Sequence, residues 1–129
     1  MEFHHQGVVT DDAIALSNRL TEVLGVRECH VEQFAGMEVR FMAFEDGYFE
    51  LLEPLGDSPL TGYLEDHGPG IHHVAFSTSD IEGRLERASE VGVKLLDEEP
   101  RDGAWGHEIA FLHPRDLGGI LVEYVAAEH

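Results

Sequence analysis

Histidine and glutamate residues recur at matching places in the two halves of this sequence. Residues 3–12 contain a His pair preceded by an apolar residue and followed by a short apolar run, Thr and Asp, and residues 71–80 repeat this pattern 68 positions later. A second repeat, at a separation of 73 positions, puts Glu50 and Glu123 inside apolar segments late in each half. Two imidazoles and two carboxylates suit a divalent first-row ion such as Co, Mn, Ni, Zn or Fe. The repeats therefore predict a metal site.

Each His pair offers two candidate ligands, because neighbouring residues of a strand point to opposite faces. His5 and His73 occupy equivalent positions in the repeat, and so do His4 and His72, so the repeat alone does not choose between the two sets. A single His in a strand is more often packed or exposed than bound to metal. A fourfold match through an internal repeat is harder to reach by chance, even among nine histidines. The metal hypothesis is therefore favoured.

The elements that must position these residues are expected to follow the order β-α-β-β-β in each half. For the first half we expect strand Glu2–Val9, a helix from the cap residues Thr10–Asp12 to about Leu24, and strands Val26–Phe34, Met37–Phe44 and Tyr48–Leu55. For the second half we expect strand Ile71–Thr78, a helix along Ile81–Val91 with Ser79 and Glu82 as a capping box, and strands Val93–Leu96, Glu108–His113 and Ile120–Val125. The apolar stripe of the first helix is expected at Ile14, Leu16, Leu20, Val23 and Leu24.

This order predicts an α+β fold of two paired βαβββ modules that share a metal cleft. A length of 129 residues fits one domain over residues 1–129, with module 1 at about 1–55 and module 2 at about 71–129. Residues 56–70 read as a linker rich in Gly, Pro and Asp, with one or two helical turns. The loop Asp97–His107 is long for a hairpin and is expected to cover the site.

The composition limits the partners. The chain carries 26 acidic and 8 basic residues, a formal net charge of −18, which disfavours nucleic acids and anionic membranes as partners. No apolar run approaches the roughly 20 residues of a membrane span, and no signal-peptide pattern is present. The single Cys29 excludes an intramolecular disulfide. We expect a cytoplasmic protein, and the acidic excess favours a halophilic one whose self-repulsion is screened by salt.

With these residues in view, the chain resembles the vicinal oxygen chelate superfamily, whose glyoxalase-like fold pairs βαβββ modules. Within it, the sequence is most similar to the methylmalonyl-CoA epimerase family. The similar stretches are Phe49–Gly56, Gly70–Phe76, Asp97–Pro100, Gly103–Gly106, Phe111–Pro114 and Gly118–Glu123. The resemblance selects the second His of each pair and implies His5, His73 and Glu123 as metal ligands, with Glu50 at the fourth position.

The resemblance also implies an activity. It is the interconversion of the C2 epimers of methylmalonyl-CoA by 1,1-proton transfer through a metal-stabilised enolate. It implies an acyl-CoA as the small-molecule substrate, a divalent metal ion (Co, Mn, Ni or Zn) as the cofactor, and a homodimer. Two bases on opposite faces of C2 fit a duplicated site, and we hypothesise that Glu50 and Glu123 are these catalytic bases.

One position departs from the family pattern. An acidic residue proposed as a base in some members aligns near Val39, and the adjacent Glu38 should face the other side of its strand. We therefore expect no base from this strand.

Three alternatives remain open from the sequence. A lactoylglutathione lyase uses a similar His/Glu/His/Glu set. Only the amino-acid sequences of the loops argue against it. An extradiol dioxygenase needs two His and one Glu and would not require Glu50. A metal-free small-molecule binding protein of the same fold typically lacks the full ligand set that is present here.

Overall fold

The computed structural model describes residues 1–127, and these residues form two compact units. The N-terminal unit is His5–His72, and the C-terminal unit combines Met1–His4 with residues 73–127. The chain therefore passes from one unit to the other inside two strands, directly after His4 and directly after His72. The last two residues of the expected module 2 lie outside the described residues.

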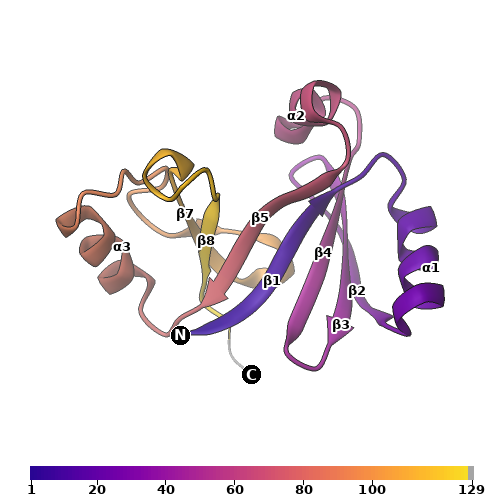
Figure 1. The fold of residues 1–129 in the computed structure, drawn as a ribbon, viewed down its shortest axis with the longest axis horizontal. Coiled ribbons are helices and arrows are strands. Elements are labelled where there is room, and N and C mark those ends of the chain that lie inside the picture. Colours follow the sequence, from indigo (N-terminus) through magenta and orange to yellow (C-terminus); the bar gives the residue numbers. More distant parts are fainter. Residues whose placement is uncertain (128–129) are drawn as a thin grey trace. The chain divides into compact units, whose positions relative to one another are not determined.

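The N-terminal unit carries most of the first βαβββ module (Figure 1). Its elements are β1 (Glu2–Val9, shared with the C-terminal unit), α1 (Ala13–Leu24), β2 (Arg27–Phe34), β3 (Met37–Phe44), β4 (Gly47–Pro54) and α2 (Pro59–His67). The strand order is β2-β3-β4-β1, in which β1 runs parallel to β4 and the other pairs are antiparallel. Helix α2 lies in the segment expected to be a linker with one or two helical turns.

The C-terminal unit repeats this plan. Its elements are β5 (Gly70–Ser77, shared with the N-terminal unit), α3 (Ile81–Glu90), β6 (Arg101–Asp102), β7 (Glu108–Leu112) and β8 (Val122–Val125), with 3₁₀ turns at Ala104–Gly106 and Pro114–Asp116. The strand order is β5-β8-β7-β6, and β5 runs parallel to β8. The expected α+β fold of two βαβββ modules is confirmed. Among residues 1–127, no helix combines the length and apolar character needed to cross a membrane.

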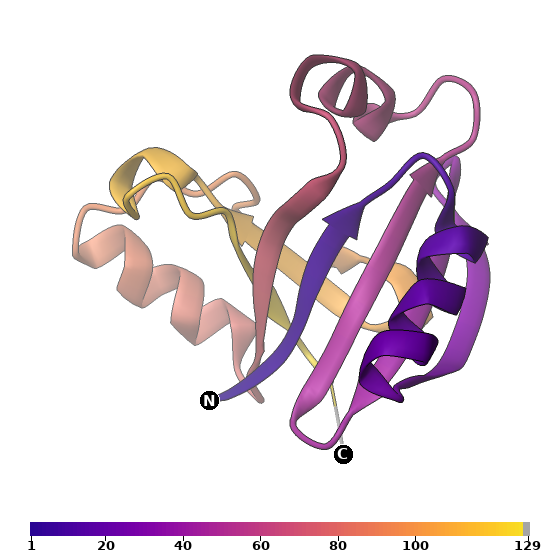
Figure 2. The same ribbon diagram turned by 45° about the vertical axis from the view of Figure 1, so that its right-hand side comes forward.

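One helix covers one face of the sheet in each unit (Figures 1 and 2). In the N-terminal unit, Ala13 of α1 packs with Met42 and Leu51. In the C-terminal unit, Leu85 of α3 packs in one cluster with Tyr124. Because side chains alternate along a strand, the residues between these core positions point to the opposite face. We call that opposite face the helix-free face of each unit.

The expected apolar stripe of α1 is only partly right. Leu16 and Leu20 pack against the core cluster, but Ile14, Val23 and Leu24 are more than half exposed. The helix instead buries Ala13 and Ser17. The small side chains at these two positions let α1 approach the sheet closely, and Ser17 Oγ lies 3.3 Å from Met42 Sδ.

The start of α3 also differs from the expected capping box at Ser79. Asp80 is the N-cap, and its Oδ1 accepts a hydrogen bond of 3.0 Å from the backbone N–H of Gly83. A β-carbon at position 83 would lie 2.2 Å from Asp80 Oδ2, so the glycine leaves room for the capping carboxylate.

The expected strand Val93–Leu96 is wrong, and a strand lies instead inside the expected loop, at Arg101–Asp102. Around Leu95 the structure has only an isolated bridge to Leu112. The Asp97 carboxylate accepts a hydrogen bond from the backbone N–H of Phe111 at 2.9 Å. The Asp97 side chain thus accepts the N–H that the backbone of a neighbouring strand would otherwise use, and the ladder of backbone hydrogen bonds stops there.

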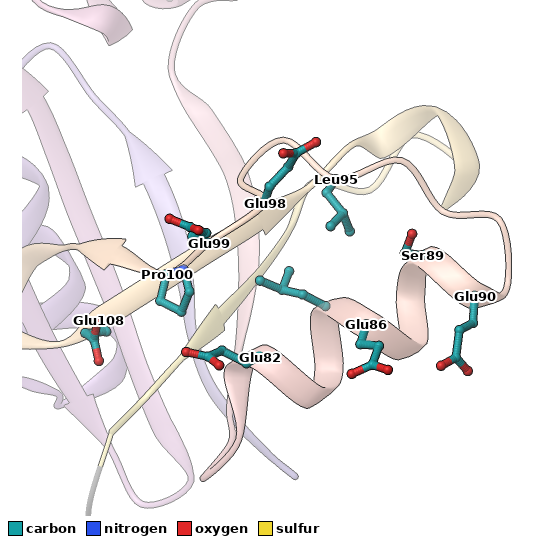
Figure 3. Close-up of a pocket in the computed structure, with 10 residues that line it drawn as sticks. Glu82, Glu86, Ser89, Glu90, Leu95, Glu98, Glu99, Pro100 and Glu108 are labelled. Carbon is teal, nitrogen blue, oxygen red and sulfur yellow. The ribbon is translucent and has the colours of Figure 1, made fainter.

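Acidic side chains border a groove of about 750 Å³ between α3 and the segment before β6 (Figure 3). Its glutamates are Glu82, Glu86, Glu90, Glu98, Glu99 and Glu108. Three of them recur every four residues along α3, where like charges destabilise a helix by about 0.2–0.5 kcal/mol per pair. The groove does not include His73 or Glu123. We expect these like charges to repel one another within the C-terminal unit.

We expect salt to stabilise the fold, because it screens repulsion among the carboxylates that give the net charge of −18. Between 0.1 M and 2 M KCl, the melting temperature followed by circular dichroism should rise by about 5 °C or more. The substitution Glu86→Gln removes the middle charge on α3. It should therefore raise the melting temperature at low salt and reduce the rise in melting temperature between 0.1 M and 2 M KCl.

The matched control is Glu65→Gln, an exposed residue of α2 in the N-terminal unit. This substitution also removes one negative charge, but at a position away from the groove. It should change the salt dependence of the melting temperature less than Glu86→Gln does. A melting temperature that is indifferent to KCl in the unsubstituted protein would contradict this account.

Candidate metal-binding pairs

Strands β1 and β4 bring His5 and Glu50 together on the helix-free face of the N-terminal unit. In the parallel register Gly7 lies opposite Glu50, and His5 is two residues earlier on the same face. The absent side chain at Gly7 leaves space beside the carboxylate. His5 Nε2 lies 3.2 Å from Glu50 Oε1, and the two side chains are 4% and 9% exposed.

Strands β5 and β8 repeat this arrangement in the C-terminal unit. Ala75 lies opposite Glu123, and His73 is two residues earlier on the same face. His73 Nε2 lies 3.2 Å from Glu123 Oε1, and these side chains are 3% and 6% exposed. The same atom types are thus held at the same separation in both units, with a small residue opposite the glutamate each time.

The separation in each pair fits two ligands of one metal ion. With bonds of about 2.1 Å from nitrogen and oxygen, two adjacent ligand atoms of a tetrahedral or octahedral ion are about 3.0–3.4 Å apart. A charge-assisted hydrogen bond between such groups is shorter, about 2.7–2.9 Å. Imidazole and carboxylate together suit Zn, Mn, Co, Ni and Fe. The donor set and its spacing therefore fit a divalent first-row ion.

A phenylalanine supports each imidazole, and sequence reasoning missed both. Phe41 meets the ring of His5 edge-on at 5.8 Å and is the cross-strand partner of Glu50. Phe111 meets the ring of His73 edge-on at 5.4 Å and is the cross-strand partner of Glu123. The two phenylalanines are 70 positions apart, between the separations of the His and Glu repeats, so an alignment of the halves would have found them. These rings fix the imidazole orientations.

His4 and His72 have aromatic neighbours instead of the paired glutamates. His4 is buried and meets the ring of His107 edge-on at 5.7 Å, and His107 in turn contacts Trp105. His72 meets the ring of Tyr63 edge-on at 4.7 Å. In each His pair it is the second His that lies beside a glutamate.

Strand β3 has no acid on the helix-free face. Glu38 accepts a hydrogen bond of 3.1 Å from Arg40, and Arg40 also donates to Glu28, which contacts Ser17 of α1. The hydrogen bond that Arg40 donates to Glu38 holds the pKa of Arg40 above its usual value. Glu38 thus faces the α1 side, as strand alternation predicted. Val39, on the other face, is fully buried.

The comparisons with known proteins agree on one family. Residues 4–111 match the model described as the Glyoxalase/Bleomycin resistance protein/Dioxygenase superfamily. The chain is 36% identical over 125 residues to an ethylmalonyl-CoA/methylmalonyl-CoA epimerase of Cereibacter sphaeroides, and the match covers 93% of each protein. It is 35% identical to the mitochondrial methylmalonyl-CoA epimerase of Mus musculus, over 93% of this chain and 70% of that protein.

A solved structure gives the same result. A variant of the Streptomyces coelicolor methylmalonyl-CoA epimerase, in complex with 2-nitronate-propionyl-CoA, is similar with a TM-score of 0.89. It is 32% identical, and the match covers 98% of this chain and 94% of that chain.

If His73 is a direct ligand, we expect His73→Ala to weaken the binding of Mn²⁺ or Co²⁺ by more than about 100-fold, whereas even supporting residues change affinity by about 10–100-fold. The measurement is a competition titration against a coloured chelator. The matched control is His72→Ala, one residue away on the opposite face. An equal loss of affinity in both variants would contradict the assignment of the second His.

Proposed function

The chain belongs to the Glyoxalase/Bleomycin resistance protein/Dioxygenase superfamily, within the methylmalonyl-CoA epimerase family, and we propose that it is a metal-dependent epimerase of methylmalonyl-CoA. The observation that carries this proposal is the pair of equivalent His–Glu contacts, each with 3.2 Å between Nε2 and Oε1. A site duplicated in this way suits a reaction that acts on the two faces of one carbon.

The proposed ligand set of one divalent ion is His5, Glu50, His73 and Glu123. Burial supports it, because a carboxylate and an imidazole that are nearly inaccessible to water need a compensating charge or hydrogen bonds. The choice among Co, Mn, Ni and Zn stays a prediction, and so do the homodimer and the cytoplasmic location.

The proposed reaction moves a proton at C2 of the acyl group. When bound, the ion would supply Lewis-acid stabilisation of the negative charge that develops on the substrate oxygens. One of Glu50 and Glu123 takes the proton on one face of C2, and the other returns a proton on the opposite face. Phe41 and Phe111 pack edge-on against the imidazoles of His5 and His73.

The direct test is solvent exchange at C2. We expect the metal-loaded protein to incorporate deuterium from D₂O into methylmalonyl-CoA, followed by mass spectrometry, while the two epimers interconvert. Ethylmalonyl-CoA and the hemithioacetal of methylglyoxal and glutathione should be run in parallel. Isomerisation of the hemithioacetal without exchange into either acyl-CoA would favour a lactoylglutathione lyase and overturn the proposal.

The substitution Glu50→Gln separates the two roles given to Glu50. An amide oxygen can still bind a metal ion, but the amide cannot accept a proton as a carboxylate does. We expect metal affinity to fall less than epimerisation, which should slow by about 100-fold or more. An unchanged epimerisation rate would remove Glu50 from proton transfer.

A further inference from the structure

A single cationic side chain lies on the helix-free face of the C-terminal unit. Within residues 1–127, Arg101 is the only lysine or arginine on strands β5, β6, β7 and β8. It is the cross-strand partner of Ile109, which shares a face with Phe111 two residues later. The guanidinium carbon lies 5.6 Å from the centre of the Phe111 ring. Arg101 therefore shares the face that carries His73 and Glu123.

Two contacts hold the Arg101 side chain in place. Asp97 Oδ1 accepts a hydrogen bond of 2.9 Å from Arg101 Nε, and Asp97 Oδ2 accepts one of 2.9 Å from the backbone N–H of Phe111. One carboxylate thus ties the guanidinium to strand β7, while the phenyl ring lies against it. Among residues 1–127, no hydrogen bond to the two Nη groups is found. A guanidinium held in this way is suited to donate both Nη groups to phosphate oxygens.

One phenyl ring separates this cation from the candidate metal pair of the same unit. The Phe111 ring meets the ring of His73 edge-on at 5.4 Å, and His73 lies beside Glu123. The side chains of His73 and Glu123 are 3% and 6% exposed, whereas that of Arg101 is 52% exposed. Arg101 is thus the exposed end of a short run of contacts that begins at the buried pair.

The acidic groove of this unit lies on the other side of the same strands. Asp102 follows Arg101 and is the cross-strand partner of Glu108, which borders the groove beside α3 (Figure 3). Because neighbouring residues of a strand point to opposite faces, the groove carboxylates and the guanidinium are directed apart. A net charge of −18 repels anionic ligands, so an anion needs a local cation to bind. The helix-free face of this unit provides one.

The two halves of the chain differ in charge at this position. Val39 and Ile109 are 70 positions apart, as are the two phenylalanines that contact the imidazoles. The cross-strand partner of Val39 is Glu32, whereas that of Ile109 is Arg101. An anion is therefore attracted beside one His–Glu pair and repelled beside the other. Such a difference can fix the direction in which a substrate with one strongly anionic end lies.

We propose that Arg101 binds the phosphate groups of the acyl-CoA substrate and thereby fixes the direction of the substrate at the duplicated site. This inference rests on the proposed function. The phosphates lie at the end of CoA that is remote from the thioester, which fits an exposed cation near a buried reacting pair. The acyl carboxylate is attached to the reacting carbon itself and so would stay at the buried pair. The Nη groups donate to phosphate oxygens while Nε stays bonded to Asp97.

The test measures Arg101→Gln and the unsubstituted protein with two substrates. Methylmalonyl-CoA carries the phosphates, and methylmalonyl-pantetheine has the same acyl group without them. For methylmalonyl-CoA we expect KM to rise about tenfold or more with kcat nearly unchanged, because the lost charged hydrogen bonds do not change during the reaction. For methylmalonyl-pantetheine both constants should stay the same. Isothermal titration calorimetry should show that free CoA binds more weakly by a similar factor.

The matched control is Arg87→Gln, which removes the same charge from an exposed residue of α3 that pairs with Glu90. This substitution should leave the binding of CoA nearly unchanged. The variant Arg101→Lys keeps the charge but loses the planar fork, and it should retain part of the affinity for CoA. Unchanged kinetics with methylmalonyl-pantetheine would show that the Arg101 variants keep an intact site.

The outcomes separate the role of Arg101 from the function on which it rests. An unsubstituted protein that exchanges no deuterium into methylmalonyl-CoA would refute the epimerase, whether or not it binds CoA. In an active protein, an unchanged KM for methylmalonyl-CoA in Arg101→Gln would overturn the role of Arg101 alone. An equal loss with both substrates would place Arg101 at the acyl group. An equal loss in Arg87→Gln would attribute the effect to net charge, and either result would also overturn the inference.

Discussion

A carboxylate inside an apolar strand costs several kcal/mol unless a partner compensates its charge, and the arrangement of this protein follows from that cost. Glu50 and Glu123 lie on strands whose neighbouring residues build the cores under α1 and α3. In both units the compensating group is an imidazole on the strand that runs parallel to the one carrying the acid. The parallel pairing of β1 with β4, and of β5 with β8, is thus the constraint on which the candidate site depends.

The duplicated residues made much of the fold and of the candidate site predictable from the sequence. The His and Glu repeats identified the residues that form close pairs, and the alternating patterns identified most strands. The repeat alone could not choose between the His residues of each pair, because both match it, whereas the family resemblance implied the second His. In the structure, the register with Gly7 and Ala75 puts that second His beside the glutamate. Phe41 and Phe111 were missed because an aromatic residue in a strand usually belongs to the core, and the sequence does not show which side chains it contacts.

The errors came from local side-chain contacts that the sequence patterns do not show. Asp97 takes the N–H of Phe111, so the expected strand at Val93–Leu96 does not form. Asp80 caps α3 in place of Ser79 because Gly83 leaves it room. On α1 the apolar stripe only partly predicted which residues are buried, since the small residues Ala13 and Ser17 make the contact with the sheet. In all three cases a local polar or steric contact determined the outcome.

The division of β1 between the units has a consequence for biosynthesis. Residues Met1–His4 belong to the C-terminal unit, where Phe3 packs edge-on against Phe76 and Ser77 Oγ donates to the backbone oxygen of Glu2. These contacts join residues that are more than seventy positions apart, and such distant pairing slows folding. The start of the chain therefore cannot reach its final partners until the second half has been synthesised. During translation the N-terminal unit can form first, while residues 1–4 remain uncommitted.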